Sequence, residues 1–220
     1  MIELDVQLSR DGELVVIHDA ELERTTTGRG AVRDNDLAEL KALDAGAWFA
    51  PEFSGERLLS LEEVVELVGA RAALNVELKA PPEDWATLVA RLDVLLRGRG
   101  LLGSAIISCF APEVLLAVRE RIPAARVGLL WQTSDFSEAW NWAGRLRAAS
   151  IHPHWSLLSA DVLAVAHARG MKVLAWTVND VGTMRTLVAA GVDGIMSDYP
   201  DRFRQVGPCN RLTHLAKALS

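Results

Sequence analysis

The chain has 220 residues, of which 50% are hydrophobic and 24% charged, so one globular domain with a sizeable core is expected. Its formal net charge of -6 argues against the basic surface that nucleic-acid binding usually needs, and small molecules are the expected partners. Because no apolar run approaches the length of a spanning helix and no secretion signal is visible, stable membrane insertion is not expected.

Short apolar or β-branched runs alternate along the chain with amphipathic segments, a pattern typical of a parallel sheet covered by helices. Eight strand–helix units close into a barrel, whereas seven leave a sheet with two edges, so the number of predicted strands is informative. The predicted strands are Ile2–Val6, Ala73–Leu78, Ala105–Phe110, Arg126–Trp131, Ser150–Pro153, Lys172–Val178 and Gly194–Ser197. The predicted helices include Leu61–Val68, Trp85–Arg97, Pro112–Arg121, Ala160–Ala168 and Val181–Ala190.

A hairpin is predicted at the start of the chain, because Asp11 and Gly12 lie between two alternating apolar runs. With these two residues at the centre of the turn, the numbers of paired residues add to 23, as 11 and 12 do. This register places Asp5 opposite His18, and Glu3 lies on the same face as Asp5. The opposite face would be apolar and formed by Leu4, Val6, Val15 and Ile17.

Charged residues also occur near the end of the second predicted strand, where Glu77 and Lys79 alternate with apolar residues. Burying a charged side chain in such a strand costs free energy unless the charge is paired or serves a function. Glu3, Asp5 and Glu77 would suit a hard divalent cation such as Mg²⁺ or Ca²⁺, with Lys79 as a point charge for a phosphate. His18 would transfer protons. A surface hairpin with solvated charges is the alternative interpretation.

Several separate motifs resemble those of the glycerophosphodiester phosphodiesterase family, from Ile2 to about Arg202. They are I-E-L-D-V, D-G-x-L-V-V-I-H-D followed by R-T-T, N-V-E-L-K, W-T-V-N and G-V-D-G-I-M-S-D, in that order. The resemblance implies a TIM-type (β/α)8 barrel. By the same resemblance, Glu3, Asp5 and Glu77 match the divalent-metal carboxylates and His18 matches the second of two catalytic histidines. Lys79 matches a phosphate-contacting lysine, and Trp176 is expected to help line the substrate pocket.

The implied reaction is hydrolysis of glycerophosphodiesters to glycerol 3-phosphate and an alcohol, within glycerophospholipid metabolism. The family's H-R-G and E-N-T motifs do not occur in this sequence, so we expect the barrel to lack its first strand–helix unit. That unit would supply the other catalytic histidine, so its absence weighs against catalytic activity of the chain as printed. Two alternatives are a lysophospholipase D-like enzyme on the same barrel and a degenerate, non-catalytic protein that binds a phosphorylated ligand.

The expected domain organisation is one incomplete barrel over residues 1–202, followed by a C-terminal tail over residues 203–220 with a possible short helix. The two cysteines, Cys109 and Cys209, fit no metal-binding or disulfide spacing, which favours a reducing compartment. A cytoplasmic location is therefore expected.

Overall fold

The computed structural model describes residues 1–79 and 81–206, which form two compact units. Of these described residues, the first unit contains those in the ranges 1–105 and 117–125, and the second contains those in the ranges 106–116 and 126–206. Most of the predicted C-terminal tail, including Cys209, lies outside the described residues. None of the helices in the described residues combines the length and the apolar character needed to cross a membrane.

The first unit is built on three strands, with β1 between the other two. β1 (Ile2–Leu8) runs antiparallel to β2 (Leu14–Val16) and parallel to β3 (Leu74–Leu78). Its helices are α1 (Leu37–Leu40), α2 (Leu61–Val68) and α3 (Trp85–Gly98), with short 3-10 turns at Val32–Asp34, Pro51–Phe53, Gly69–Arg71 and Pro82–Asp84. The helix α2 begins where the Ser60 side chain accepts a hydrogen bond from the Glu63 backbone, a capping box.

The hairpin between β1 and β2 has a register one residue away from the predicted one. Val6 pairs with Val16 and Leu8 pairs with Leu14, so the numbers of paired residues add to 22. The Ser9 amide donates to the Glu13 carbonyl, so the loop closed by this pair holds three residues rather than two. It ends at Gly12, whose φ of +78° is a conformation that glycine adopts without strain. The prediction that Asp5 faces His18 was therefore wrong.

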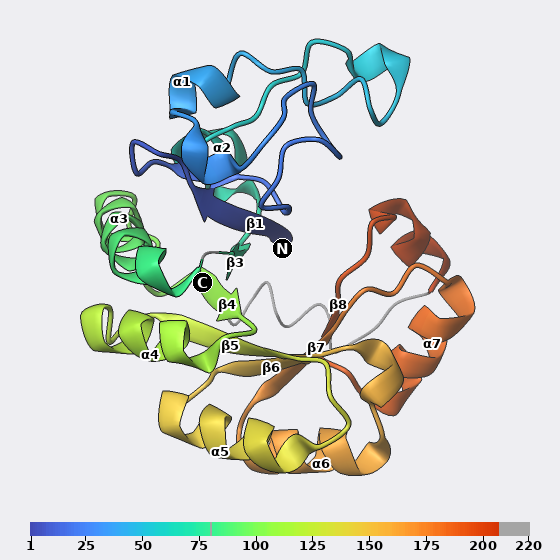
Figure 1. Ribbon diagram of the computed structural model, residues 1–220. Coiled ribbons are helices and arrows are strands. Elements are labelled where there is room, and N and C mark those ends of the chain that lie inside the picture. Colours follow the sequence, from blue (N-terminus) through green and yellow to red (C-terminus); the bar gives the residue numbers. More distant parts are fainter. Residues whose placement is uncertain (80, 207–220) are drawn as a thin grey trace. The chain divides into compact units, whose positions relative to one another are not determined.

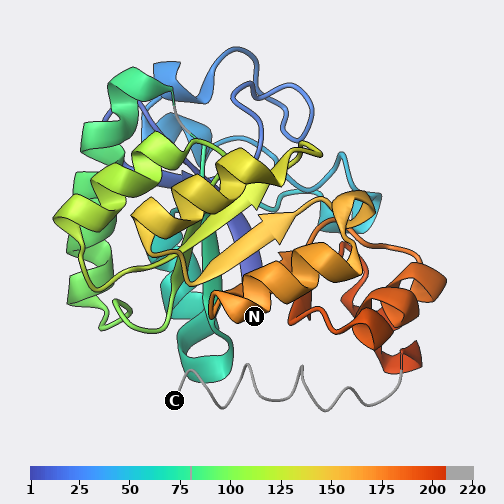
Figure 2. The ribbon, with the colours of Figure 1, turned by 90° about the horizontal axis from the view of Figure 1, so that it is seen from below.

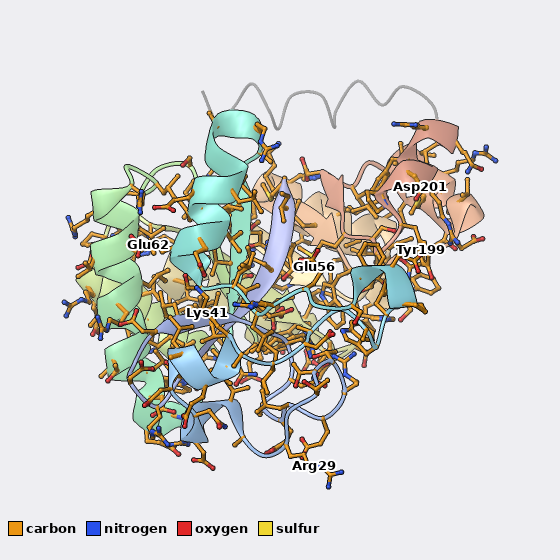
Figure 3. All side chains as sticks on the ribbon, turned by 90° about the horizontal axis from the view of Figure 1, so that it is seen from above. Arg29, Lys41, Glu56, Glu62, Tyr199 and Asp201 are labelled. Atoms are coloured by element: carbon orange, nitrogen blue, oxygen red, sulfur yellow. The ribbon has the colours of Figure 1, made fainter. Side chains whose placement is uncertain are left out.

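The predicted single apolar face is divided between two cores for the same reason. Directly paired residues point to the same side of an antiparallel sheet, so Val15 shares a face with Gln7 and not with Val6. Val15 and Ile17 pack instead against the segment of residues 19–60, whose outer side carries Arg29 (Figure 3). The buried members of this second core are Val15, Ile17, Leu22, Val32, Leu40 and Leu58.

In the described residues, the second unit carries five strands that pair in parallel and in sequence order. They are β4 (Ile106–Cys109), β5 (Arg126–Trp131), β6 (Ser150–Pro153), β7 (Lys172–Ala175) and β8 (Gly194–Ile195). The helices are α4 (Pro112–Arg121), which is divided between the units, α5 (Phe136–Leu146), α6 (Ala160–Ala168) and α7 (Val181–Ala190). Two 3-10 turns cover Trp155–Leu157 and Pro200–Gln205.

Helices α5 and α6 lie along the outer side of the strands of the second unit (Figures 1 and 2). The predicted strands and helices all have counterparts in the structure, and α5 is a helix that the sequence analysis did not include. Asp135 caps α5 by accepting a hydrogen bond from the Ser137 backbone. The alternation of parallel strands and helices is that of an α/β barrel.

A row of small buried residues crosses three strands of the second unit. Ser108, Gly128 and Ser150 are neighbours across β4, β5 and β6, and the Ser150 hydroxyl lies 2.7 Å from His152 Nε2. The His152 side chain is fully buried. A Cβ atom at Gly128 would lie 2.5 Å from His152 Nε2, so the absence of a side chain at this position makes room for the imidazole.

We expect Gly128→Ala to lower the free energy of unfolding by about 1–3 kcal/mol, because the new methyl group would displace a buried ring. Gly144→Ala is the matched control, since a Cβ atom there meets nothing within 4 Å and the site lies inside α5. It should raise the free energy of unfolding by about 0.5–1 kcal/mol. Urea unfolding of both variants checks the prediction, which equal effects would contradict.

Burial lowers the pKa of His152 to about 3, well below the value of about 6.5 for an unperturbed histidine. The unfolded chain then takes up a proton as the pH falls below about 6.5, while the folded chain does not until about pH 3, so stability decreases over that range. Between pH 7 and pH 5 the loss due to His152 should be roughly 2 kcal/mol. Urea unfolding of His152→Gln should show a smaller loss than the parent protein, and parallel curves would contradict this origin.

Candidate active site

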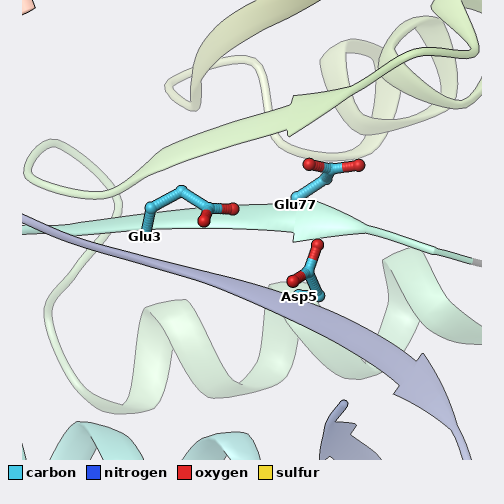
Figure 4. A group of neighbouring side chains, drawn as sticks. All are labelled: Glu3, Asp5 and Glu77. Carbon is cyan, nitrogen blue, oxygen red and sulfur yellow. The ribbon is translucent and has the colours of Figure 1, made fainter. Parts of the chain in front are cut away.

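Three carboxylates converge on β1 and β3. The parallel register pairs Asp5 directly with Glu77, and Glu3 lies two residues before Asp5 on the same face of β1. One carboxylate oxygen from each residue lies within 4.8 Å of the others (Figure 4). In the described part of the chain, no other group of three His, Cys, Asp or Glu side chains brings ligand atoms together in this way.

Lys79 balances part of this negative charge. Its Nζ lies 2.5 Å from Glu77 Oε1 and 3.4 Å from Asp5 Oδ1. Burial raises the pKa of Glu77 even though Lys79 opposes the change. Partial burial alone would lower the pKa of Lys79, but the adjacent Glu77 and Asp5 outweigh it and the pKa is raised. Both shifts reflect one compact, partly desolvated charge cluster.

The structure brings His18 to this cluster through Lys79. His18 Nε2 lies 3.3 Å from Lys79 Nζ, although the hairpin register does not pair His18 with Asp5. The backbone at this point is fixed from two sides, because the Ile17 amide donates to the Asp5 carbonyl and the Gln7 side chain donates to the His18 carbonyl. Glu3, Asp5, Glu77, Lys79 and His18 therefore form one neighbourhood in the first unit.

Trp176 belongs to the second unit and follows β7. Its indole nitrogen donates to the His152 carbonyl at 2.7 Å, and its ring meets Phe110 and His154 edge-on at centroid distances of 5.4 and 5.2 Å. These contacts hold the indole rigidly. Its assignment to the substrate pocket stays a prediction.

Two residues beside His18 were not singled out in the sequence. Asp19 Oδ1 lies 2.6 Å from His18 Nδ1, and Arg24 donates to both oxygens of Asp19. The available signal was a carboxylate directly after a candidate catalytic histidine, within the motif that includes R-T-T. Side-chain hydrogen bonds five residues apart in an irregular segment follow no periodic pattern.

Parallel strands and helices with a charged cluster near one end of the strands define the class of α/β-barrel enzymes. Within this class, the chain belongs to the glycerophosphoryl diester phosphodiesterase family, whose sequence model matches residues 1–202. The predicted family, enzyme class and TIM-type α/β fold are thereby confirmed.

Individual relatives agree with this assignment. A glycerophosphodiester phosphodiesterase from Caldanaerobacter subterraneus is 39% identical over 201 residues, which cover 91% of this chain and 82% of the relative. One from Bacillus subtilis is 33% identical over 221 residues, covering 93% and 75% of the two chains. The structure of an Oleispira antarctica phosphodiesterase in complex with the product sn-glycerol-3-phosphate superposes with a TM-score of 0.84 at 32% identity, covering 93% and 83%.

Proposed function

We propose that the protein hydrolyses glycerophosphodiesters to glycerol 3-phosphate and an alcohol, with a divalent cation at Glu3, Asp5 and Glu77. The observation that carries the proposal is the convergence of three carboxylates beside Lys79 and His18 in a member of this family. The product named for the Oleispira antarctica phosphodiesterase supports the choice of glycerol 3-phosphate.

The donor set fits a hard cation. All three side chains offer oxygen, which suits Mg²⁺ or Ca²⁺ better than the softer metals that prefer sulfur and nitrogen. Within the described residues, the buried Glu77 Oε1 accepts no hydrogen bond of ordinary geometry, and its close contact is the ion pair with Lys79. A bound cation would supply positive charge that offsets the phosphate and the negative charge developing on the departing oxygen.

The side chains around the carboxylates would bind the phosphate and transfer the proton. The Lys79 ammonium group would hold a non-bridging phosphate oxygen as a point charge. His18 Nε2, which already faces Lys79, would exchange a proton with the attacking hydroxyl or with the departing oxygen. We place this reaction in the breakdown of deacylated phospholipids, in the reducing cytoplasm that the cysteine usage favours.

Cation binding can be measured without turnover. Isothermal titration calorimetry with Mg²⁺ and with Ca²⁺ should give a dissociation constant that Glu77→Gln raises about tenfold or more, because one charged ligand is lost. Glu52→Gln makes the same charge change at an exposed position of the first unit and should leave the dissociation constant unchanged. Equal affinities in all three proteins would exclude Glu77 as a ligand.

The reaction itself is tested by following glycerol 3-phosphate release from glycerophosphocholine with each cation. Chelation should abolish release, and Glu77→Gln should lower kcat/KM by about 100-fold or more. Thermal stabilisation by glycerol 3-phosphate without any turnover would indicate the non-catalytic binding protein. Choline release from lysophosphatidylcholine but not from glycerophosphocholine would indicate the lysophospholipase D-like enzyme.

A further inference from the structure

The imidazole of His18 is held at both ring nitrogens by charged groups. Nδ1 lies 2.6 Å from Asp19 Oδ1, and Nε2 lies 3.3 Å from Lys79 Nζ. The side chain of His18 is 59% exposed and that of Asp19 is 24% exposed, so the carboxylate is the more enclosed partner. The ring is therefore oriented from its enclosed side while much of it stays accessible.

Arg24 fixes the carboxylate that contacts the imidazole. Its Nη2 donates to Asp19 Oδ1 at 2.9 Å, and its Nε donates to Asp19 Oδ2. The hydrogen bonds from Arg24, followed by the contact with His18, lower the pKa of Asp19 far below its usual value. Asp19 is thus a carboxylate at every pH at which the folded protein would work, and it can only accept hydrogen bonds.

The two neighbours define one tautomer of His18. A carboxylate has no proton to donate, so the hydrogen between Asp19 and the ring must be on Nδ1. An ammonium group has no lone pair, so Nε2 must accept from Lys79. Both requirements are met by a neutral imidazole with its proton on Nδ1 and its lone pair on Nε2.

We propose that Asp19 and Arg24 are positioning residues that hold His18 in its Nδ1-protonated tautomer, with Nε2 directed at the charge cluster. The inference rests on the proposed function in one respect, which is that His18 transfers a proton. Asp19 acts through the imidazole, and Arg24 acts through Asp19.

An ordinary surface ion pair would not hold the imidazole of His18 in one orientation. Exposed ion pairs contribute little to stability, and their geometry is loose. Here the His18 carbonyl is also held by the largely buried Gln7, so both the backbone and the ring of His18 are fixed. A carboxylate that accepts hydrogen bonds on both oxygens cannot rotate without breaking several of them at once.

The test is Asp19→Asn, which keeps the size of the side chain. Because the Arg24 side chain has only hydrogen-bond donors, it should donate to the single amide oxygen of the new asparagine. The amide nitrogen would then face His18 Nδ1. An amide N–H needs a lone pair on Nδ1, so the ring proton should move to Nε2, and the Lys79 ammonium group should then turn from Nε2 toward Glu77 and Asp5. Imidazole ¹⁵N NMR should show Nδ1–H for His18 in the parent protein and Nε2–H in the variant, with the signal assigned by its loss in His18→Gln.

Kinetics supply the second readout. Asp19→Asn should lower kcat about 100-fold or more while KM and the dissociation constant for Ca²⁺ change less than about threefold, because proton transfer and not binding is impaired. Arg24→Gln is a second variant that frees Asp19 but keeps the carboxylate, and a smaller decrease in kcat is expected. Asp36→Asn is the matched control, because Asp36 also pairs with an arginine, Arg10, in the same unit at a half-buried position. It should alter neither readout.

The outcomes separate this inference from the proposed function. An Nε2–H tautomer in the parent protein, or no tautomer change in Asp19→Asn, overturns the positioning role whether or not the protein turns over substrate. A parent protein with the expected tautomer but without activity supports the positioning role and contradicts the proposed function. Equal losses of kcat in Asp19→Asn and Asp36→Asn would also overturn it.

Discussion

The parallel pairing of β1 with β3 sets Asp5 directly beside Glu77 and thereby forces two carboxylates together near the end of β3. Like charges at this separation repel, and the buried position of Glu77 strengthens the repulsion because little water screens it. The strand pairing is made by backbone hydrogen bonds and apolar neighbours, which resist a shift in register. The fold therefore imposes an electrostatic cost that the side chains around the pair must offset.

Lys79 offsets only part of this cost. With all three carboxylates ionised, three negative charges face one ammonium group, which leaves a net charge of -2 in a partly buried cluster. The raised pKa of Lys79 is a consequence of that imbalance, because Glu77 and Asp5 favour its charged form, whereas the pKa of Glu77 is raised chiefly by burial. A divalent cation is the complement that would neutralise the cluster, and this is the physical basis for proposing one there.

The regular alternation of side chains along the strands was the sequence feature from which structure could be predicted. Period-two spacing was enough to group Glu3 with Asp5 and to place Glu77 at the end of a neighbouring strand, where the structure also has them. The register of the β1–β2 hairpin could not be obtained in this way, because Gly12 fits either a two-residue turn or the observed three-residue loop. The contact between His18 and Asp19 depends on the irregular segment that follows β2, where no period applies.

That irregular segment links apolar packing to the orientation of the imidazole. Leu22 lies between Asp19 and Arg24 in the chain, is only 1% exposed, and belongs to the core that also contains Val15 and Ile17. Its amide donates to the Gly30 carbonyl and its carbonyl accepts from the Thr26 amide, so the turn is fixed at its centre. Burying one leucine side chain contributes about 2 kcal/mol, more than an exposed ion pair supplies. The geometry of Asp19 and Arg24 thus depends on a core that includes no residue of β1 or β3, the two strands whose pairing sets the carboxylates.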